Sequence, residues 1–314
     1  MSQIESKVDV VIVCHNSAEI IQPLLRSLEP ALHPGVDLNL VVVDNASTDD
    51  TIDRIVAIGK GVVVLPMPTN LGYAGAINCA LRTVREDSDI LVLNPDVVVS
   101  PQSVLPLTEA LRSGTCGITA PVLRLPDGSL QFTMRRRPTI VRAFGDAVLG
   151  GSRAGRFERL GETVVDPVRY QTPCSSAWFM GAALMISRRC FEALGPLDDS
   201  FFLYSEDTEY CLRAWRRGLR CDLVPAALMM HSGGESQARP DLRALLATNR
   251  IRLYRSSHGL LATVLFAVAV FINESIRAGR GARECRTSAL TVLRRGIRGV
   301  LFSNAHNHSD IVRT

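Results

Sequence analysis

The 314-residue chain lacks several of the features that identify common functional classes. Its eight cysteines include no C-x-x-C pair, which argues against a zinc ribbon or a thioredoxin-like site. Neither G-x-G-x-x-G nor G-x-x-x-x-G-K-[ST] occurs, so dinucleotide oxidoreductases and P-loop enzymes are disfavoured. The first residues, Met1 to Lys7, are polar and lead directly into strand-like sequence, so we expect no signal peptide.

Lysine is almost absent, since arginine supplies 33 of the 35 basic residues. The net charge of +4 is modest, and no nucleic-acid partner is expected. Several cysteines lie inside apolar runs, where a thiol behaves as a small hydrophobe, and this favours a reducing, cytosolic compartment. Many of the arginines come late in the chain: Arg277, Arg280, Arg283, Arg286, Arg294, Arg295 and Arg298.

No apolar run reaches the roughly twenty residues that a membrane-spanning helix needs. The longest candidate is the 13-residue stretch from Leu260 to Ile272, and arginine-rich sequence follows it. This pattern is typical of a helix lying in or on a membrane interface. It is equally typical of a buried core helix, and the sequence leaves both interpretations open.

The first hundred residues alternate between apolar, β-branched runs and helical patterns. Strands are predicted at 8–13, 38–43, 62–65 and 90–93. Continuous apolar strands of this kind indicate a parallel sheet covered on both faces, and such sheets bind ligands beyond the carboxyl ends of their strands. Polar side chains follow three of the strands: His15, Asn16, Asp44, Asn45, Asn94 and Asp96.

The second half of the chain is less regular. Asp127-Gly128 is typical of a hairpin turn, and Gly181 allows a close backbone approach. Residues 135–170 are basic and poorly periodic, so we expect a mobile loop region there. Residues 206–217 have the pattern of a helix.

Three short motifs carry the chemistry, and each follows an apolar segment. They are Asn94-Pro95-Asp96, Ser205-Glu206-Asp207 and His231-Ser232-Gly233-Gly234. Together they offer oxygen ligands or bases and one imidazole, a set that suits a divalent cation beside a diphosphate and proton removal from a hydroxyl. Each motif also has a structural interpretation: a strand-end turn, acids in a helix's first turn, and a hydrogen-bonded histidine.

The motifs VVIVCHN, VVVDNASTDDT, NLGYAGAIN, LVLNPDVVV and the run from GAALMIS to AWRRG resemble family 2 glycosyltransferases over residues 8–258. The most similar branch is the rhamnosyltransferase-like one of bacterial cell-surface polysaccharide synthesis. The resemblance implies an α/β, GT-A fold: a mainly parallel sheet flanked by helices. It implies a catalytic domain at 1–240, with a nucleotide-binding half at about 1–125 and an acceptor half at about 126–240. A basic, helical extension, 241–314, would follow.

The resemblance also implies inverting transfer of one sugar from dTDP-rhamnose or a UDP-sugar to a glycan or a polyprenyl-diphosphate-linked acceptor. Asp207 would be the catalytic base, with Glu206 beside it, and Asp96 and His231 would bind a divalent metal, Mn²⁺ or Mg²⁺. The implied donor-binding residues are His15, Asn16, Asp44, Asn45, Asn70, Gly72, Asn94 and Asp96.

Two departures from the family pattern bear on these expectations. The usual D-x-D is Asn94-x-Asp96 here, so one carboxylate is replaced by an amide. The Q-x-x-R-W signature of processive synthases is missing, which favours transfer of a single sugar. A peripheral location on the inner face of the cell membrane is expected, with homodimer formation as another use of the C-terminal segment.

Two other functions remain as alternatives. A sugar nucleotidyltransferase needs a glycine-rich, basic loop after its first strand, and residues 14–18 supply neither glycine nor charge. A catalytically inactive, membrane-associated scaffold of the same fold is the non-enzymatic alternative.

Overall fold

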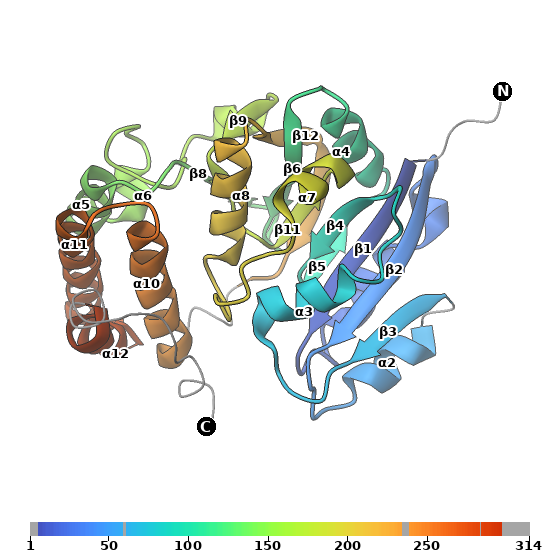
Figure 1. Cartoon of the computed structure of the whole chain (residues 1–314), viewed down its shortest axis with the longest axis horizontal. Helices are drawn as coiled ribbons and strands as arrows, with labels where there is room; N and C mark the ends of the chain where they lie inside the picture. Colours follow the sequence, from blue (N-terminus) through green and yellow to red (C-terminus); the bar gives the residue numbers. More distant parts are fainter. Residues whose placement is uncertain (1–5, 59–60, 234–238, 283, 297–314) are drawn as a thin grey trace. The chain divides into compact units, whose positions relative to one another are not determined.

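The computed structural model describes residues 6–58, 61–233, 239–282 and 284–296. The chain forms two compact units, which we call unit 1 and unit 2 (Figure 1). Unit 1 contains residues 1–134, 167–199 and 206–232, and unit 2 contains residues 135–166, 200–205 and 233–314. The division into a catalytic domain, 1–240, and an extension, 241–314, remains a prediction. In the structure, residues 135–166 group with the C-terminal helices.

Unit 1 is built on a mixed sheet whose strand order is β3-β2-β1-β4-β11-β6-β12-β5, with β7 beside β6 and β9 beside β12. The four predicted strands correspond, in chain order, to β1, β2, β3 and β4. They run parallel to one another, which confirms the predicted parallel arrangement. In contrast, β11 pairs antiparallel with β4 and β6, and β5 pairs antiparallel with β12. The strands are β1 (Ser6–Cys14), β2 (Val36–Asp44), β3 (Val62–Pro66), β4 (Asp89–Leu93), β5 (Val97–Val99), β6 (Cys116–Arg124), β7 (Leu130–Gln131), β8 (Met134–Arg135), β9 (Cys174–Ser176), β10 (Trp178–Phe179), β11 (Ala183–Ile186) and β12 (Arg220–His231).

The sheet strands form the core of unit 1 together with the flanking helices. Buried aliphatic side chains of β1 and β4 pack with those of α1 and α4. The predicted hairpin is confirmed, since β6 and β7 pair antiparallel on either side of Asp127-Gly128. The helices are α1 (Ile21–Ser27), η1 (Pro30–Leu32), α2 (Thr51–Ile58), α3 (Gly72–Ala80), α4 (Val104–Leu111), η2 (Pro167–Tyr170), α7 (Arg188–Leu194) and α8 (Glu206–Arg216).

The regular elements that the structure describes in unit 2 are mainly helices. They are α5 (Ile140–Leu149), α6 (Gly151–Ala154), α10 (Pro240–Arg255), α11 (Leu260–Gly279), α12 (Glu284–Thr291) and η3 (Val292–Gly296). The expectation of a mobile loop region over 135–170 is wrong, because α5 and α6 lie there. Thr139 caps α5 by accepting a hydrogen bond from the N–H of Arg142, and Ala143 packs into the core of unit 2. Capping and packing therefore stabilise a helix that the sequence pattern did not indicate.

Helix α11 extends seven residues beyond the predicted apolar stretch, from Leu260 to Gly279. It is the one described helix long and apolar enough to cross a membrane, and 33% of its apolar window is buried. Phe266 is fully buried, whereas Leu261 is 75% exposed and Leu265 is 43% exposed. One face of α11 is therefore core, as one interpretation predicted, and contact of the other face with a membrane stays a prediction.

We expect Phe266→Ala to lower the free energy of unfolding of unit 2 by about 3–5 kcal/mol, because it leaves a cavity in the core. Phe266 also stacks on Tyr254, with 4.2 Å between the ring centroids. Leu261→Ala on the same helix is the matched control, with an expected change within about 0.5 kcal/mol. Denaturant unfolding followed by circular dichroism measures both, and equal effects of the two substitutions would show that α11 is not packed as described.

Candidate functional site

Asp96 and His231 lie side by side because of the pairing between β5 and β12. His231 is opposite Val97, and the N–H of Ser232 donates to the carbonyl of Asp96 at 3.2 Å. The His231 Nε2 lies 3.3 Å from the Asp96 Oδ1, and the histidine is only 7% exposed. The two residues for which a metal role was predicted are thus brought together.

The other ring nitrogen of His231 has a partner that the sequence analysis did not identify. His231 Nδ1 lies 3.0 Å from the side-chain oxygen of Gln131, on β7. An amide oxygen only accepts hydrogen bonds, so Nδ1 donates to Gln131, and Nε2 is the ring nitrogen that faces Asp96. At 3.3 Å, a proton or a cation between Nε2 and Oδ1 would hold the two atoms together.

Tyr73, on α3, bonds to Asn94 and lies within electrostatic range of the acidic residues of α8. Its hydroxyl donates to Asn94 Oδ1 at 2.8 Å. Burial raises the pKa of Tyr73, and the nearby carboxylates of Glu206, Asp207 and Asp96 raise it further. Tyr73 belongs to the motif NLGYAGAIN, and no role for it was predicted from the sequence.

Asp207 is held in place by two backbone N–H groups. Its Oδ2 accepts from the N–H of Gly181 at 2.8 Å, and its Oδ1 accepts from the N–H of Thr208 at 2.6 Å. A Cβ atom on Gly181 would lie 3.0 Å from both the Cβ and the Oδ2 of Asp207. The predicted close approach at Gly181 is therefore confirmed, and Asp207 is the residue that approaches.

Glu206 lies in a different environment from its neighbour. It is 5% exposed, and its Oε2 is buried with no hydrogen-bond partner among the described residues. Burial raises its pKa well above the ordinary value, and the charge of Asp207 raises it further. The two adjacent acids thus differ: Glu206 favours its protonated form, whereas Asp207 has a carboxylate fixed by backbone donors.

Asp44, at the carboxyl end of β2, offers a second buried carboxylate oxygen without a partner. Asp44 is 2% exposed, and its Oδ2 accepts from the N–H of Ser47 at 3.2 Å. Its Oδ1 is buried and has no hydrogen-bond partner among the residues that the structure describes. A buried acceptor of this kind is costly unless something donates to it, which suits contact with an N–H or hydroxyl of a ligand.

The remaining predicted donor-binding residues form a hydrogen-bonded loop cluster. The Asn45 Nδ2 donates to Asn70 Oδ1 at 2.9 Å and to the Gly72 carbonyl at 3.2 Å. His15 Nδ1 lies 3.0 Å from the Asn45 carbonyl. Asn16 accepts from the N–H of Thr48 at 2.8 Å. The amide of Asn45 therefore holds the loop before α3, and His15 and Asn16 are the exposed members of the cluster.

Asp96 and His231 can supply two ligands to a divalent cation. Among the described residues, no group of three or more His, Cys, Asp or Glu side chains is arranged to hold a metal ion. A cation that keeps substrate phosphate oxygens and water as ligands needs only one or two protein side chains. Adjacent ligands of an octahedral ion lie about 3 Å apart, close to the separation of these two atoms. The pair therefore fits a metal shared with a diphosphate.

Comparison with known proteins points to one family. The pattern of Glycosyl transferase family 2 matches residues 9–179. The N-acetylglucosaminyl-diphospho-decaprenol L-rhamnosyltransferase of Mycobacterium tuberculosis is 30% identical over 77% of this chain and 81% of its own length. The dTDP-rhamnosyl transferase RfbF of Shigella flexneri is 24% identical over 96% of this chain and 99% of its own length.

A solved structure shows the fold. The mannosyltransferase PcManGT from Pyrobaculum calidifontis, in complex with GDP-Man and Mn²⁺, has a TM-score of 0.57 at 16% identity. The match covers 94% of this chain and 87% of that one. The predicted GT-A fold is therefore confirmed. Since the family pattern spans more than half of the chain and the mycobacterial relative covers three quarters of it, the chain belongs to glycosyl transferase family 2, as a nucleotide-sugar glycosyltransferase similar to rhamnosyltransferases.

Proposed function

We propose that this protein is a metal-dependent, inverting glycosyltransferase that moves one sugar from a nucleotide-diphospho-sugar to an acceptor hydroxyl. The observation that carries the proposal is the facing pair Asp96 and His231, with Asp207 and Asp96 both within electrostatic range of Tyr73. Cation, diphosphate and base would then meet at one end of the sheet, where α/β folds bind their ligands.

The cation would be held by Asp96 Oδ1 and His231 Nε2. Mn²⁺ is present in the complex of the mannosyltransferase PcManGT, and it accepts imidazole and carboxylate ligands together. When bound, the ion neutralises the charge that develops on the leaving diphosphate. Tyr73 donates a hydrogen bond to the side chain of Asn94 and so fixes its orientation. This amide replaces the first carboxylate of the usual D-x-D motif.

The proposed catalytic base is Asp207. The N–H groups of Gly181 and Thr208 fix the direction in which its carboxylate points. As a base it takes the proton of the attacking hydroxyl while the bond to the anomeric carbon forms on the face opposite the diphosphate. Glu206, which favours its protonated form, can donate a hydrogen bond to the acceptor without competing for that proton.

The proposed donor is dTDP-rhamnose or a UDP-sugar, with Asp44 Oδ1 accepting from the base N3–H or from ribose. His15, Asn16, Asn45, Asn70 and Gly72 shape the nucleotide loop around it. The name of the Shigella relative includes dTDP-rhamnosyl transfer, and that of the mycobacterial relative includes a decaprenol-linked acceptor. These names support a rhamnosyl donor and a glycan or polyprenyl-diphosphate-linked acceptor.

A lipid-linked acceptor would place the protein on the inner face of the cell membrane as a peripheral protein. The exposed leucines of α11 support that location. Homodimer formation through the same face is the other use that we consider for these side chains.

We expect Asp207→Asn to lower kcat by about 10²–10⁴-fold, because the amide cannot accept the proton. Nucleotide-sugar binding, measured by calorimetry, should be unchanged. Glu209→Gln on the same helix is the control and should retain activity. Sugar transfer by Asp207→Asn at the native rate would contradict the assignment of the base, and an inactive native protein with intact donor binding would favour the scaffold alternative.

We expect Gln131→Leu to raise the Mn²⁺ concentration needed for nucleoside-diphosphate binding by about 10–100-fold, since partners of a ligating histidine contribute that much to metal affinity. His231→Ala should raise it at least as far. Asp222→Asn, a carboxylate change elsewhere in unit 1, is the control. Calorimetric titration of the metal measures the effect, and unchanged affinity in His231→Ala would exclude a metal at this place.

We expect the Glu206→Gln variant to become more stable relative to the native protein as the pH rises, when their free energies of unfolding are compared. The folded state holds the Glu206 proton more tightly than the unfolded state, because its pKa is raised above the ordinary value near 4.5. That stabilisation is complete at acid pH and is lost as the pH rises through the raised pKa, whereas glutamine does not ionise. Thermal unfolding across the pH range tests this. A difference that stays constant, or that shrinks towards alkaline pH, is the contrary result.

A further inference from the structure

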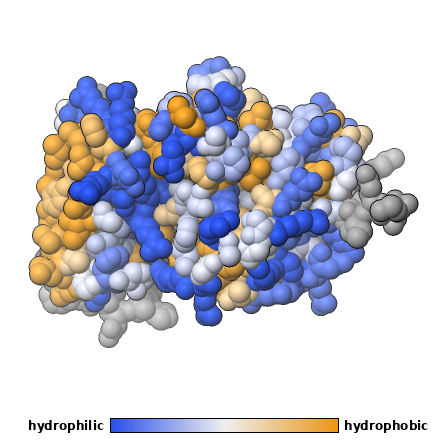
Figure 2. Space-filling model, turned by 90° about the horizontal axis from the view of Figure 1, so that it is seen from above, coloured by the Kyte–Doolittle hydropathy of each residue, from blue (hydrophilic) through white to orange (hydrophobic). Residues whose placement is uncertain are grey.

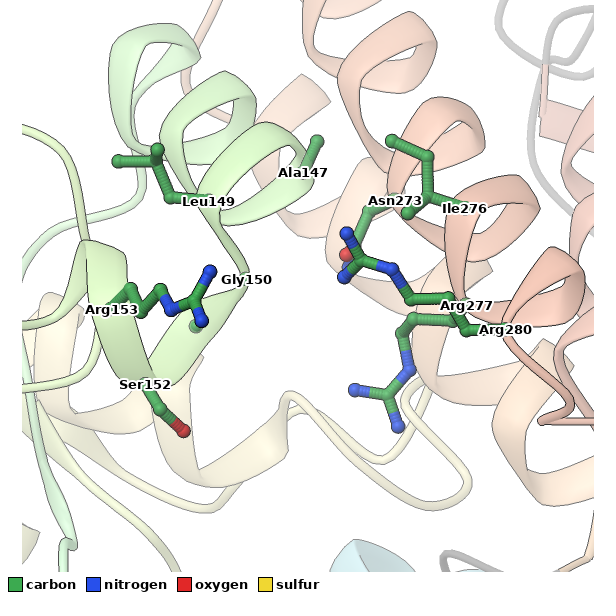
Figure 3. Close-up of a pocket in the computed structure, with 10 residues that line it drawn as sticks. Ala147, Leu149, Gly150, Ser152, Arg153, Asn273, Ile276, Arg277 and Arg280 are labelled. Atoms are coloured by element: carbon green, nitrogen blue, oxygen red, sulfur yellow. The ribbon is translucent and has the colours of Figure 1, made fainter.

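A basic cavity in unit 2 has no part in the proposed transfer. It has a volume of about 500 Å³ and lies between the end of α5, helix α6 and the last turns of α11 (Figure 3). Arg153 comes from α6, and Arg277 and Arg280 come from the end of α11. Figure 3 shows the three guanidinium groups pointing into one space.

These arginines are not explained by pairing within the protein. Within the described part of the chain, no carboxylate forms an ion pair with Arg153, Arg277 or Arg280. Arg277 also lies beside the Cys285 thiol, where it opposes the rise in the pKa of that thiol caused by burial. The helix dipole favours cations at the end of α11, and it acts only weakly on Arg153, because α6 has four residues. Three like charges around one space therefore favour an anion.

Apolar side chains are exposed on the same helices that line the cavity. Val148 of α5 is 63% exposed, and Leu149 is 37% exposed and lines the cavity itself. On α11, which packs against α5, Leu261 and Leu265 are exposed as well. Figure 2 shows apolar residues gathered at the left of the view, where Figure 1 places α5 and α11.

The distribution of charge between the units agrees with an anionic partner for unit 2. Unit 2 contains 20 arginines against nine acidic residues, a net charge of +11, which leaves −7 for unit 1 in a chain of net charge +4. A surface that combines leucine and valine with arginine matches a bilayer whose headgroups are anionic.

We propose that the cavity formed by Arg153, Arg277 and Arg280 binds the phosphate of an anionic phospholipid headgroup, while the exposed apolar side chains of α5 and α11 enter the acyl region. Guanidinium groups form paired, charge-assisted hydrogen bonds to phosphate oxygens. Ser152 and Asn273, which also line the cavity, add uncharged polar groups. The inference deepens the proposed peripheral location and requires neither the metal nor the base.

The test uses the full-length protein and sedimentation with vesicles of phosphatidylcholine, with or without phosphatidylglycerol. The pocket variant carries Arg153→Gln, Arg277→Gln and Arg280→Gln. The matched control carries Arg156→Gln, Arg159→Gln and Arg286→Gln, which removes the same charge from exposed positions of unit 2 outside the cavity. Unchanged thermal unfolding establishes that both variants are folded.

We expect the native protein to bind vesicles containing phosphatidylglycerol, and the pocket variant to bind them about a hundredfold more weakly, since each basic residue at an anionic surface contributes roughly a fivefold effect. The control variant should lose much less. Equal losses in the two variants would show general charge attraction and overturn the site. Absence of vesicle binding by the native protein would also overturn it. Self-association of the native protein that Leu261→Gln abolishes would overturn it as well, because α11 would then be a dimer interface.

These results are separable from the test of the transferase function. Loss of sugar transfer with vesicle binding retained would count against the catalytic proposal alone. Loss of vesicle binding, with transfer to a soluble acceptor retained, would count against the lipid site alone.

Discussion

The arrangement of the site depends on one antiparallel pairing, between the three-residue strand β5 and the end of β12. That pairing sets His231 beside Asp96, although the two residues come from distant parts of the sequence. Gln131 then fixes the ring so that Nε2 faces a carboxylate oxygen. A ring nitrogen beside a carboxylate oxygen suits the proposed cation, which would be shared with a diphosphate. The same short strand follows Asn94, which accepts a hydrogen bond from Tyr73, and Tyr73 lies within electrostatic range of Asp96, Glu206 and Asp207.

The contrast between the neighbouring acids of α8 follows from the same packing. Because Gly181 has no side chain, its backbone N–H approaches Asp207 closely enough to bond it. Glu206 points into a buried environment and lacks such a partner for its Oε2 among the described residues. Adjacent carboxyl groups with different environments can serve different roles, one accepting a proton and the other retaining its own.

Much of the sheet, and both members of the proposed metal-binding pair, could be predicted from the sequence. Apolar β-branched runs identified β1 to β4, and the polar residues after them identified Asp44, Asn94 and Asp96 as candidates. Tyr73 and Gln131 could not be assigned, because their roles come from contacts between distant segments. Helix α5 was missed because tertiary packing stabilises it. Helix α11 is longer than its apolar run because Glu274 is buried in an ion pair with Arg243 and so continues the helix without contributing hydropathy.

The account stands on a cation between Asp96 and His231. The most direct test is a crystal structure of the protein grown with Mn²⁺ and a nucleoside diphosphate, with anomalous diffraction measured near the manganese edge. The account predicts an anomalous peak in contact with Asp96 Oδ1, His231 Nε2 and the diphosphate oxygens. A bound diphosphate with no peak at these two side chains, or with the ion held elsewhere, would contradict it.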